Sequence, residues 1–586
     1  MRPCDTQFTL LLNFVARRLQ SHSSALDSSA CDADVLSSQE ILKDYAIREI
    51  NILLWFALFV ITAVLLKKLF FVFKIWAYGC QIPGPPSPSF CGHSTLFCSS
   101  DSQFDLTEFL VESHKKYGSM VRLWLSPTQL LVSIKEPSLI NEMLSKAGDK
   151  MPLIGRVYRL AFGQSRFFVS SFEKVKRSRD ILACELNGKL LEKSSIMTDR
   201  VINSVMERTA GIMEKGALDC EMFSQHMAFS ILGATLFGDA FFAWSKANAY
   251  EELLLRIAKD ACFWASYSVP PFWKRGYWKY QRLCIKLKSL TEDVVQHSQL
   301  NKLLSPSNGY INTEMPGAEA SSDSNISCID KIEKASSEES CCPLNLKEEP
   351  CGNVMGMMFH GCLTTAGQIS NILARLGMHP EMQHKIYSEV IMVRRRSDKS
   401  TKLDVREMHL LLATIYESAR LLPAGPLLQR CLLRQDLKLK NGVVIPAGAL
   451  LVAPVELVQM DENNWGSDAG VFNPYRFLSK VETASQLDRR SKTTDAVEVP
   501  VNSGVESYNL NDPYKNAAYL PFGSGLRACV GQKFAVLGIA SILASLLEHY
   551  EIKLVPEPEI EPRLLMVNCV LQLVPSPKIV FVRRNA

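Results

Sequence analysis

The stretch FGSGLRACVG, residues 522–531, is the most informative segment of this 586-residue chain. Gly525 and Gly531 permit backbone conformations and close approaches that a side chain would block. Arg527 places a cation near Cys529, where it can stabilise an anion. The apolar run that follows, QKFAVLGIASILASLLEHY, contains no proline and predicts a helix, whose positive N-terminal end favours a thiolate. The segment therefore predicts a reactive cysteine at the start of a helix.

A buried cysteine without a chemical role is the simpler alternative, since free cysteine is often just a small core residue. The full frame F-x-x-G-x-R-x-C-x-G argues against it, and this frame resembles the haem-binding loop of the cytochrome P-450 family. Further stretches resemble the same family in the same order: IPGPP (82–86), FHGCLTTAGQI (359–369), YESAR (416–420) and FNPYRF (472–477). The resemblance covers about residues 82–584 and implies a single large catalytic domain, mainly α with small β-sheets.

The resemblance implies that Cys529 is the proximal ligand of the iron of haem b. Arg527 and Arg430 are implied to contact the haem propionates. The other residues of the loop that are implied to hold the cofactor are Phe522, Gly525 and Gly531.

A helix motif and a later arginine are implied to form the structural core beneath the haem. Glu417 and Arg420 form E-x-x-R, and Arg476 belongs to the following motif. A bidentate link between arginine and carboxylate suits a buried site, because charges there must be paired. Tyr475 stands where the family usually has glutamate, which we interpret as tolerated variation.

Residues 172–176, FEKVK, stand where many relatives have W-x-x-x-R. Phe172 cannot donate the indole hydrogen bond, and Lys176 offers a point charge instead of a guanidinium fork. Lys176 is thus a candidate propionate contact, with a basic solvated helix face as the alternative.

The distal stretch departs from the family pattern A/G-G-x-D/E-T. Gly361 is implied to let the helix open beside bound oxygen, and Thr364 to support proton delivery. Leu363 stands where the acid is expected and cannot relay a proton. His360 is a candidate substitute because imidazole titrates near neutral pH, and a polar residue lining the pocket is the alternative.

The resemblance implies, as the leading hypothesis, a monooxygenase that takes electrons from NADPH through NADPH–cytochrome P-450 reductase, activates dioxygen and oxidises a lipophilic small molecule such as a terpenoid, sterol or fatty acid. Residues 151–168 and 227–273 are expected to line its pocket. Leu363 keeps a second hypothesis open, a haem–thiolate isomerase or dehydratase that acts on a hydroperoxide without a reductase. A third hypothesis is a non-catalytic haem-binding protein.

Composition is compatible with these hypotheses. Hydrophobic residues make up 47% of the chain, enough for a sizeable core. The net charge of +5 is modest, so no nucleic-acid partner is expected. The 17 cysteines are odd in number and form no regular framework, which suits a reducing compartment.

A membrane anchor is predicted at residues 50–76. Residues 50–66 carry no charge, Lys67 and Lys68 follow, and a proline hinge begins at Pro83. The positive side is expected to face the cytosol. We therefore expect a single-pass protein of the endoplasmic reticulum membrane with a cytosolic catalytic domain; a buried core helix is the alternative. Residues 1–49 form an extension of unclear role, for which a plastid transit peptide is a weaker hypothesis.

The catalytic domain is predicted to span residues 82–586. Two polar segments within it, residues 305–351 and 481–511, are expected to be flexible insertions because they lack apolar periodicity.

Overall fold

The computed structural model describes residues 38–87, 92–93, 106–150, 160–161, 171–214, 216–267, 270–304, 351–396, 404–431, 435–480, 508–555, 563–567 and 570–584. The chain divides into two compact units, residues 1–73 and 74–586. Most of the two expected insertions, residues 305–350 and 481–507, lies outside the described residues, as do residues 1–37 of the N-terminal extension.

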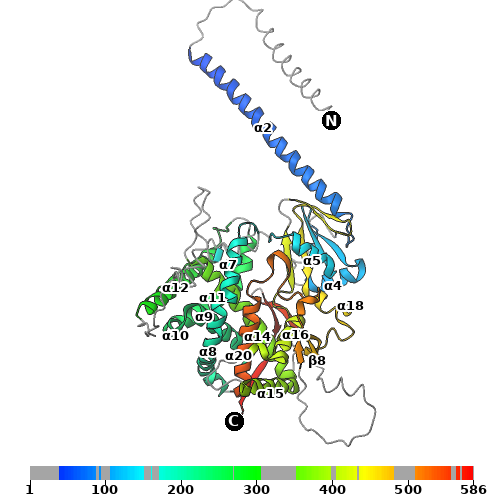
Figure 1. Ribbon diagram of the computed structural model, residues 1–586. Coiled ribbons are helices and arrows are strands. Elements are labelled where there is room, and N and C mark those ends of the chain that lie inside the picture. Colours follow the sequence, from blue (N-terminus) through cyan, green and yellow to red (C-terminus); the bar gives the residue numbers. More distant parts are fainter. Residues whose placement is uncertain are drawn as a thin grey trace, which may run out of the picture. The chain divides into compact units, whose positions relative to one another are not determined.

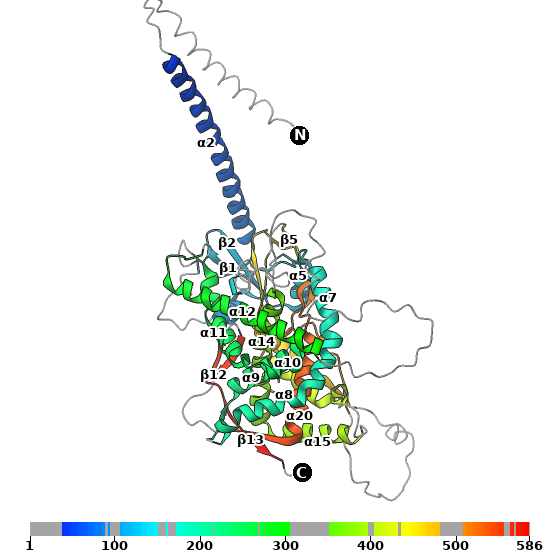
Figure 2. The same ribbon diagram turned by 90° about the vertical axis from the view of Figure 1, so that its left-hand side faces the viewer.

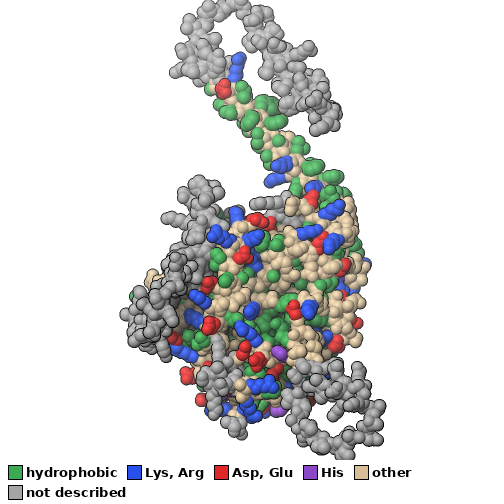
Figure 3. All heavy atoms as spheres, in the orientation of Figure 1, with side chains coloured by type: hydrophobic (Ala, Val, Ile, Leu, Met, Phe, Trp, Pro, Cys, Tyr) green, Lys and Arg blue, Asp and Glu red, His purple; other side chains and the backbone are tan. Residues whose placement is uncertain are grey.

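Helix α2 (Ser38–Gly79) runs without interruption through and beyond the predicted anchor. Its residues 46–79 form the one helix in the described part of the chain that is long and apolar enough to cross a membrane. Large side chains such as Trp55 and Phe59 are exposed along it, and Figure 3 shows hydrophobic side chains over its length. The most apolar 18 residues of this span are not buried within the protein, which argues against the alternative of a buried core helix.

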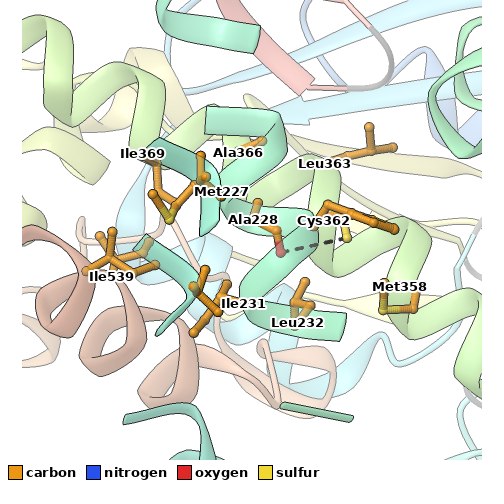
Figure 4. Packing of buried hydrophobic residues seen from close by; sticks show 14 of the residues in the cluster. Met227, Ala228, Ile231, Leu232, Met358, Cys362, Leu363, Ala366, Ile369 and Ile539 are labelled. Carbon is orange, nitrogen blue, oxygen red and sulfur yellow. Dashed lines mark hydrogen bonds between the residues drawn. The ribbon is translucent and has the colours of Figure 1, made fainter. Parts of the chain in front are cut away.

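Two long apolar helices form the centre of the second unit. Helix α14 (Gly352–Met378) packs against α9 (Cys220–Phe237), and both carry a high share of buried side chains. Figure 4 shows Met227 of α9 beside Ile369 of α14, and Ala228 of α9 facing Cys362 of α14. Burying each such side chain contributes about 1.5–3 kcal/mol, which fixes the position of α14.

Further helices surround this pair (Figures 1 and 2). Helix α8 (Lys189–Met213) packs on α9, α20 (Gln532–His549) packs on α8, and α16 (His409–Leu421) contacts both α14 and α20. The helices of this unit besides α9 and α14 are α4 (Leu106–Tyr117), α5 (Pro137–Lys146), α7 (Lys176–Asn187), α8 (Lys189–Met213), α10 (Asp239–Ala243), α11 (Ala247–Ser266), α12 (Arg275–Leu304), α15 (Pro380–Arg396), α16 (His409–Leu421), α17 (Val455–Gln459), α18 (Glu462–Trp465) and α20 (Gln532–His549).

A four-stranded sheet forms beside a second core cluster. Its order is β1 (Met120–Ser126), β2 (Gln129–Ile134), β7 (Leu450–Pro454) and β4 (Leu427–Cys431), with β2 and β7 parallel and the other pairs antiparallel. The smaller sheets are β10 (Tyr550–Leu554), β13 (Lys578–Arg583) and β3 (Leu218–Asp219); β11 (Arg563–Val567) and β12 (Val570–Val574); β5 (Leu437–Lys438) and β6 (Val444–Ile445); β8 (Leu478–Lys480) and β9 (Tyr508–Leu510).

The predicted fold class, mainly α with small sheets, is confirmed. One boundary is corrected: residues 508–510, expected to belong to the second insertion, form strand β9, which pairs with β8. Next to this strand, the backbone N–H of Asn511 donates to the Phe477 carbonyl at 2.8 Å.

Candidate functional site

The loop that carries Cys529 is closed by its own backbone. The N–H of Cys529 donates to the carbonyl of Phe522 at 2.9 Å. Gly523 and Gly525 have φ of 69° and 68°, a region that side chains disfavour. A Cβ at Gly525 would lie 2.3 Å from the Leu144 carbonyl oxygen, so only glycine fits there. Gly531 has no such constraint from the protein, since its φ is −92° and its nearest neighbour would be 3.6 Å away.

The Cys529 side chain is exposed, yet enough protein surrounds it that desolvation raises the pKa of its thiol. Three features oppose this rise and favour the thiolate: the backbone N–H of Gly531, which N-caps α20, and the positive charges of Arg179 and Lys150. The side chain is thus accessible but flanked by cations, as an anionic metal ligand needs to be.

Four basic side chains gather near this cysteine: Lys150, Arg179, Arg430 and Arg527. Desolvation, followed by repulsion from the three arginines, lowers the pKa of Lys150 to about 7. Desolvation and like charges also lower the pKa of Arg430 and of Arg527, each to about 10. Such a cluster is costly unless an anion joins it.

Backbone contacts hold these side chains in place. Arg179 in α7 donates to the Ala528 carbonyl at 2.5 Å. Arg527 donates through Nε to the Gly148 carbonyl at 2.9 Å, and its guanidinium lies 5.5 Å from the centre of the Phe172 ring. The residue before Lys150 forms a β-bridge with Cys431, next to Arg430.

The cluster fits the propionates of a haem. Arg430 is 3% exposed, and its Nε is buried without a hydrogen-bond partner in the described part of the chain. A carboxylate is the natural acceptor for such a donor. The donor set around Cys529 is therefore one thiolate for the iron and several cations for two carboxylates.

Arg179 and Lys150 are site residues that the sequence motifs did not indicate. Lys176, the predicted propionate contact, is exposed at the first residue of α7, whereas Arg179 reaches the loop one turn later. Helical spacing could have indicated that Arg179 is an alternative to Lys176, because residues i and i+3 share a face of a helix. No local signal marks Lys150, which the bridge between Asp149 and Cys431 brings in from a distant part of the chain.

The three predicted core residues meet in one charged network. Glu417 accepts two hydrogen bonds from Arg420, both at 2.8 Å, and one from Arg476 at 3.1 Å. Glu417 and Arg420 are completely buried. Arg420 also donates to the carbonyls of Gln459 and Ala469, while Arg476 pairs with Asp468 at 2.9 Å. The departure at Tyr475 leaves this network intact, since its hydroxyl accepts from Lys385 instead.

The predicted distal residues of α14 differ in burial. The Thr364 hydroxyl donates to the His360 carbonyl at 2.8 Å, so these residues are stacked one turn apart. Leu363 is buried in the apolar core beside Cys362, whose thiol contacts the Ala228 carbonyl of α9 (Figure 4). Leu363 is therefore buried against the core, whereas His360 is exposed and Thr364 is half-buried.

His360 is exposed, yet desolvation and then the charge of Lys150 lower the pKa of its imidazole to about 4. The ring is therefore neutral at physiological pH. It is a weaker proton donor than the sequence alone predicted, which disfavours the role of a simple substitute for the missing acid.

The family model of cytochrome P450 matches residues 82–581. The chain belongs to the cytochrome P450 family. Cytochrome P450 734A1 of Arabidopsis thaliana is 24% identical over 77% of this chain and 79% of its own. Cytochrome P450 4F6 of Rattus norvegicus is 23% identical over 86% of this chain and 89% of its own. The 11-oxo-beta-amyrin 30-oxidase of Glycyrrhiza uralensis is 32% identical, but the match spans only 33% of this chain and 31% of that enzyme.

Membership in the cytochrome P450 family gives the cysteine loop its chemical meaning. The family uses haem b, bound through a cysteine thiolate, and the basic cluster around Cys529 fits that cofactor. Curated relatives from both plants and animals match the chain.

Proposed function

We propose that this P450 is a membrane-anchored haem–thiolate monooxygenase that oxidises a lipophilic small molecule with dioxygen and electrons from NADPH. The observation that carries the proposal is the accessible Cys529 in a glycine-shaped loop flanked by Arg179 and Lys150. A bound haem supplies oxygen activation, which the thiolate promotes by donating electron density to the iron.

The chain's own residues would hold and orient the cofactor. Arg179, Arg430 and Arg527 would bind the propionates, and Lys150 would add a fourth charge. Cys529 would bind the iron. Thr364 would hold a proton at its hydroxyl on the accessible face of α14, oriented by the His360 carbonyl.

A lipophilic substrate and a membrane location are supported by exposed apolar side chains near the start of α12. Phe272, Trp273 and Trp278 are each more than half exposed, and Ile285 is 66% exposed. Phe272, Trp278 and Ile285 help to line a surface hollow with Pro270 and Tyr277. Exposed aromatic side chains of this kind favour contact with a lipid interface.

Only part of the predicted lining of the substrate pocket can be compared with the described structure. Of residues 151–168, only 160–161 lie among the described residues. Met227 and its neighbours in α9 are core residues packed against α14, so they are less suited to contact a substrate than the sequence suggested. The small hollow beside Phe229 and Leu363 lies in this same core.

The electron donor we propose is NADPH–cytochrome P450 reductase, and the proposed location is the endoplasmic reticulum membrane with the catalytic domain in the cytosol. The lysines that follow the apolar span support this orientation. A plastid location stays the weaker hypothesis, because its only support lies in residues 1–37, outside the described part.

The first experiment tests the iron ligand. We expect the carbon monoxide complex of the reduced protein to show the red-shifted Soret band of a thiolate-bound haem. Cys529→Ala should abolish that band, whereas Cys184→Ala should preserve it, since Cys184 is an exposed cysteine in α7. Persistence of the band in Cys529→Ala would contradict the proposal.

A second candidate function is a haem–thiolate isomerase or dehydratase that acts on a hydroperoxide. The buried, apolar Leu363 favours it, because no acid stands at that position. Turnover that requires both oxygen and reductase supports the monooxygenase, and hydroperoxide turnover without reductase supports the isomerase. A normal haem spectrum without either activity would indicate a non-catalytic haem-binding protein.

A further inference from the structure

Helix α12 carries large apolar side chains on a face that the core does not bury. Tyr280, Cys284 and Leu287 recur at helical spacing and are buried in the main core cluster. Trp278 and Ile285 lie about two helical turns apart on another face, and both are more than half exposed. Exposed apolar side chains that lie together indicate a binding surface.

These two side chains belong to the wall of a surface hollow of about 370 Å³. Phe272 and Tyr277 extend the apolar part of the wall. The volume lies within the range of about 300–1,000 Å³ that is typical of small-molecule sites. The hollow can therefore hold a ligand, and its lining is predominantly apolar and aromatic.

Contacts within the protein hold the wall of this hollow in place. The indole Nε1 of Trp278 donates to the Phe272 carbonyl at 2.7 Å, and the Phe272 N–H donates to the Pro270 carbonyl at 2.9 Å. Tyr277 is buried, and its ring packs edge-on against Trp264 with 5.8 Å between the ring centres. A ligand therefore meets a preformed surface, which lowers the entropic cost of binding.

Two polar side chains of α12, Gln281 and Arg282, also line the hollow. The Nε2 atom of Gln281 is buried and has no hydrogen-bond partner in the described part of the chain. Arg282 is exposed, and none of the residues that line the hollow is acidic. Between Arg275 and Thr291 the helix has five basic residues and no acidic one. An anionic acceptor would satisfy the amide and neutralise the guanidinium.

We propose that this hollow binds one long-chain carboxylate, such as a free fatty acid. The apolar chain would lie against Phe272, Trp278 and Ile285. The carboxylate would accept hydrogen bonds from Arg282, whose planar guanidinium matches its geometry, and from the Gln281 amide. A single small hollow suits a single chain, which favours this ligand over a lipid with two chains. None of the lining residues is one that we assign to the haem.

The test uses the full-length protein in phosphatidylcholine nanodiscs and a palmitate that carries a photoreactive diazirine on its chain. Mass spectrometry locates the labelled residues. Within residues 74–586, the label should concentrate on residues 270–285. Hydrogen bonds to a charged group contribute about 1.5–3 kcal/mol, so unlabelled palmitate should compete at least about tenfold better than its methyl ester.

A pair of charge variants tests the carboxylate contact. Arg282→Gln should weaken labelling at residues 270–285 about tenfold or more and keep the thermal stability of wild type, because Arg282 is exposed. Lys286→Gln is the matched control, since Lys286 is an exposed cation of the same helix that does not line the hollow. This control should label as wild type does.

Equal labelling of wild type and Arg282→Gln would overturn the inference. Equal competition by palmitate and its methyl ester would do the same, because the carboxylate would then have no role. The third decisive outcome concerns Ile196 and Ile212 of α8, which are also exposed. If they are labelled as strongly as residues 270–285, the probe reaches the protein only from the bilayer and the hollow is not a specific site.

Discussion

Lys150 is the residue at which charge and burial conflict most strongly. Its pKa falls from 10.5 to about 7 because desolvation and three arginines disfavour the ammonium. The unfolded chain therefore binds more protons than the folded protein between about pH 7 and pH 10.5. Stability rises with pH wherever the unfolded state binds more protons, so haem-free protein should become more stable across this window.

Lys150→Met should remove this dependence. The variant should be more stable than wild type at pH 7 and show a flatter rise towards pH 10, measured by urea unfolding of the haem-free protein. Lys174→Met, at an exposed position before α7, serves as the control and should keep the wild-type slope. If the free energy of unfolding rises equally with pH in wild type and in Lys150→Met, Lys150 does not cause the pH dependence.

Arg179 should matter more than its neighbours in the same helix. It donates to the Ala528 carbonyl and acts on Cys529, whereas Arg177 is exposed. A hydrogen bond to a charged group contributes about 1.5–3 kcal/mol, so Arg179→Ala should weaken haem binding roughly ten- to hundredfold. Haem transfer to apomyoglobin measures this loss. A comparable loss in Arg177→Ala would show that general basicity, not this contact, retains the haem.

At the scale of elements, Glu417 joins three separate parts of the chain. It pairs with Arg420 of its own helix α16 and with Arg476 of the following motif, and it accepts from the Asn473 backbone at 3.0 Å. Glu417→Gln removes the charge that compensates two arginines. Breaking a buried ion pair in this way costs about 3–5 kcal/mol.

The lower stability of Glu417→Gln should appear as a lower denaturation midpoint and a smaller share of haem-loaded protein. Glu548→Gln is the matched control, because its pair with Arg394 is partly exposed and should contribute at most about 1 kcal/mol. Similar losses in both variants would argue against a special role for the Glu417 network.

The sequence predicted elements with dense local signals and missed contacts between distant segments. The loop before α20 could be predicted because glycines, a cation and a helix start lie within ten residues. Even there, Gly523 was overlooked, since its need for a positive φ follows from the turn and not from the motif. Lys150 could not be predicted, because its position depends on the bridge from Asp149 to Cys431 across hundreds of residues. Which residues of α14 are buried could likewise not be predicted, because this depends on the packing of α9 against it.

At the scale of the whole molecule, the division at residue 73 falls within α2 and leaves most of the apolar span outside the catalytic unit. A variant that begins at Lys74 keeps the loop around Cys529, the basic cluster and the Glu417 network. It should therefore bind haem with the spectrum of the full chain. Carbonate extraction should release it from membranes, whereas the full chain should resist extraction because α2 is long enough to span a bilayer.

The shortened variant should still bind lipid vesicles weakly and reversibly. Phe272, Trp273 and Trp278 are exposed close together in the chain, and aromatic side chains favour the membrane interface. Replacing all three by serine should abolish flotation of the shortened variant with vesicles and leave its haem spectrum unchanged, since these side chains lie at the surface. Replacing the exposed Ile196 and Ile212 of α8 by serine is the control and should leave flotation intact. If the aromatic variant floats as well as its parent, another surface of residues 74–586 binds the vesicles and the prediction is wrong.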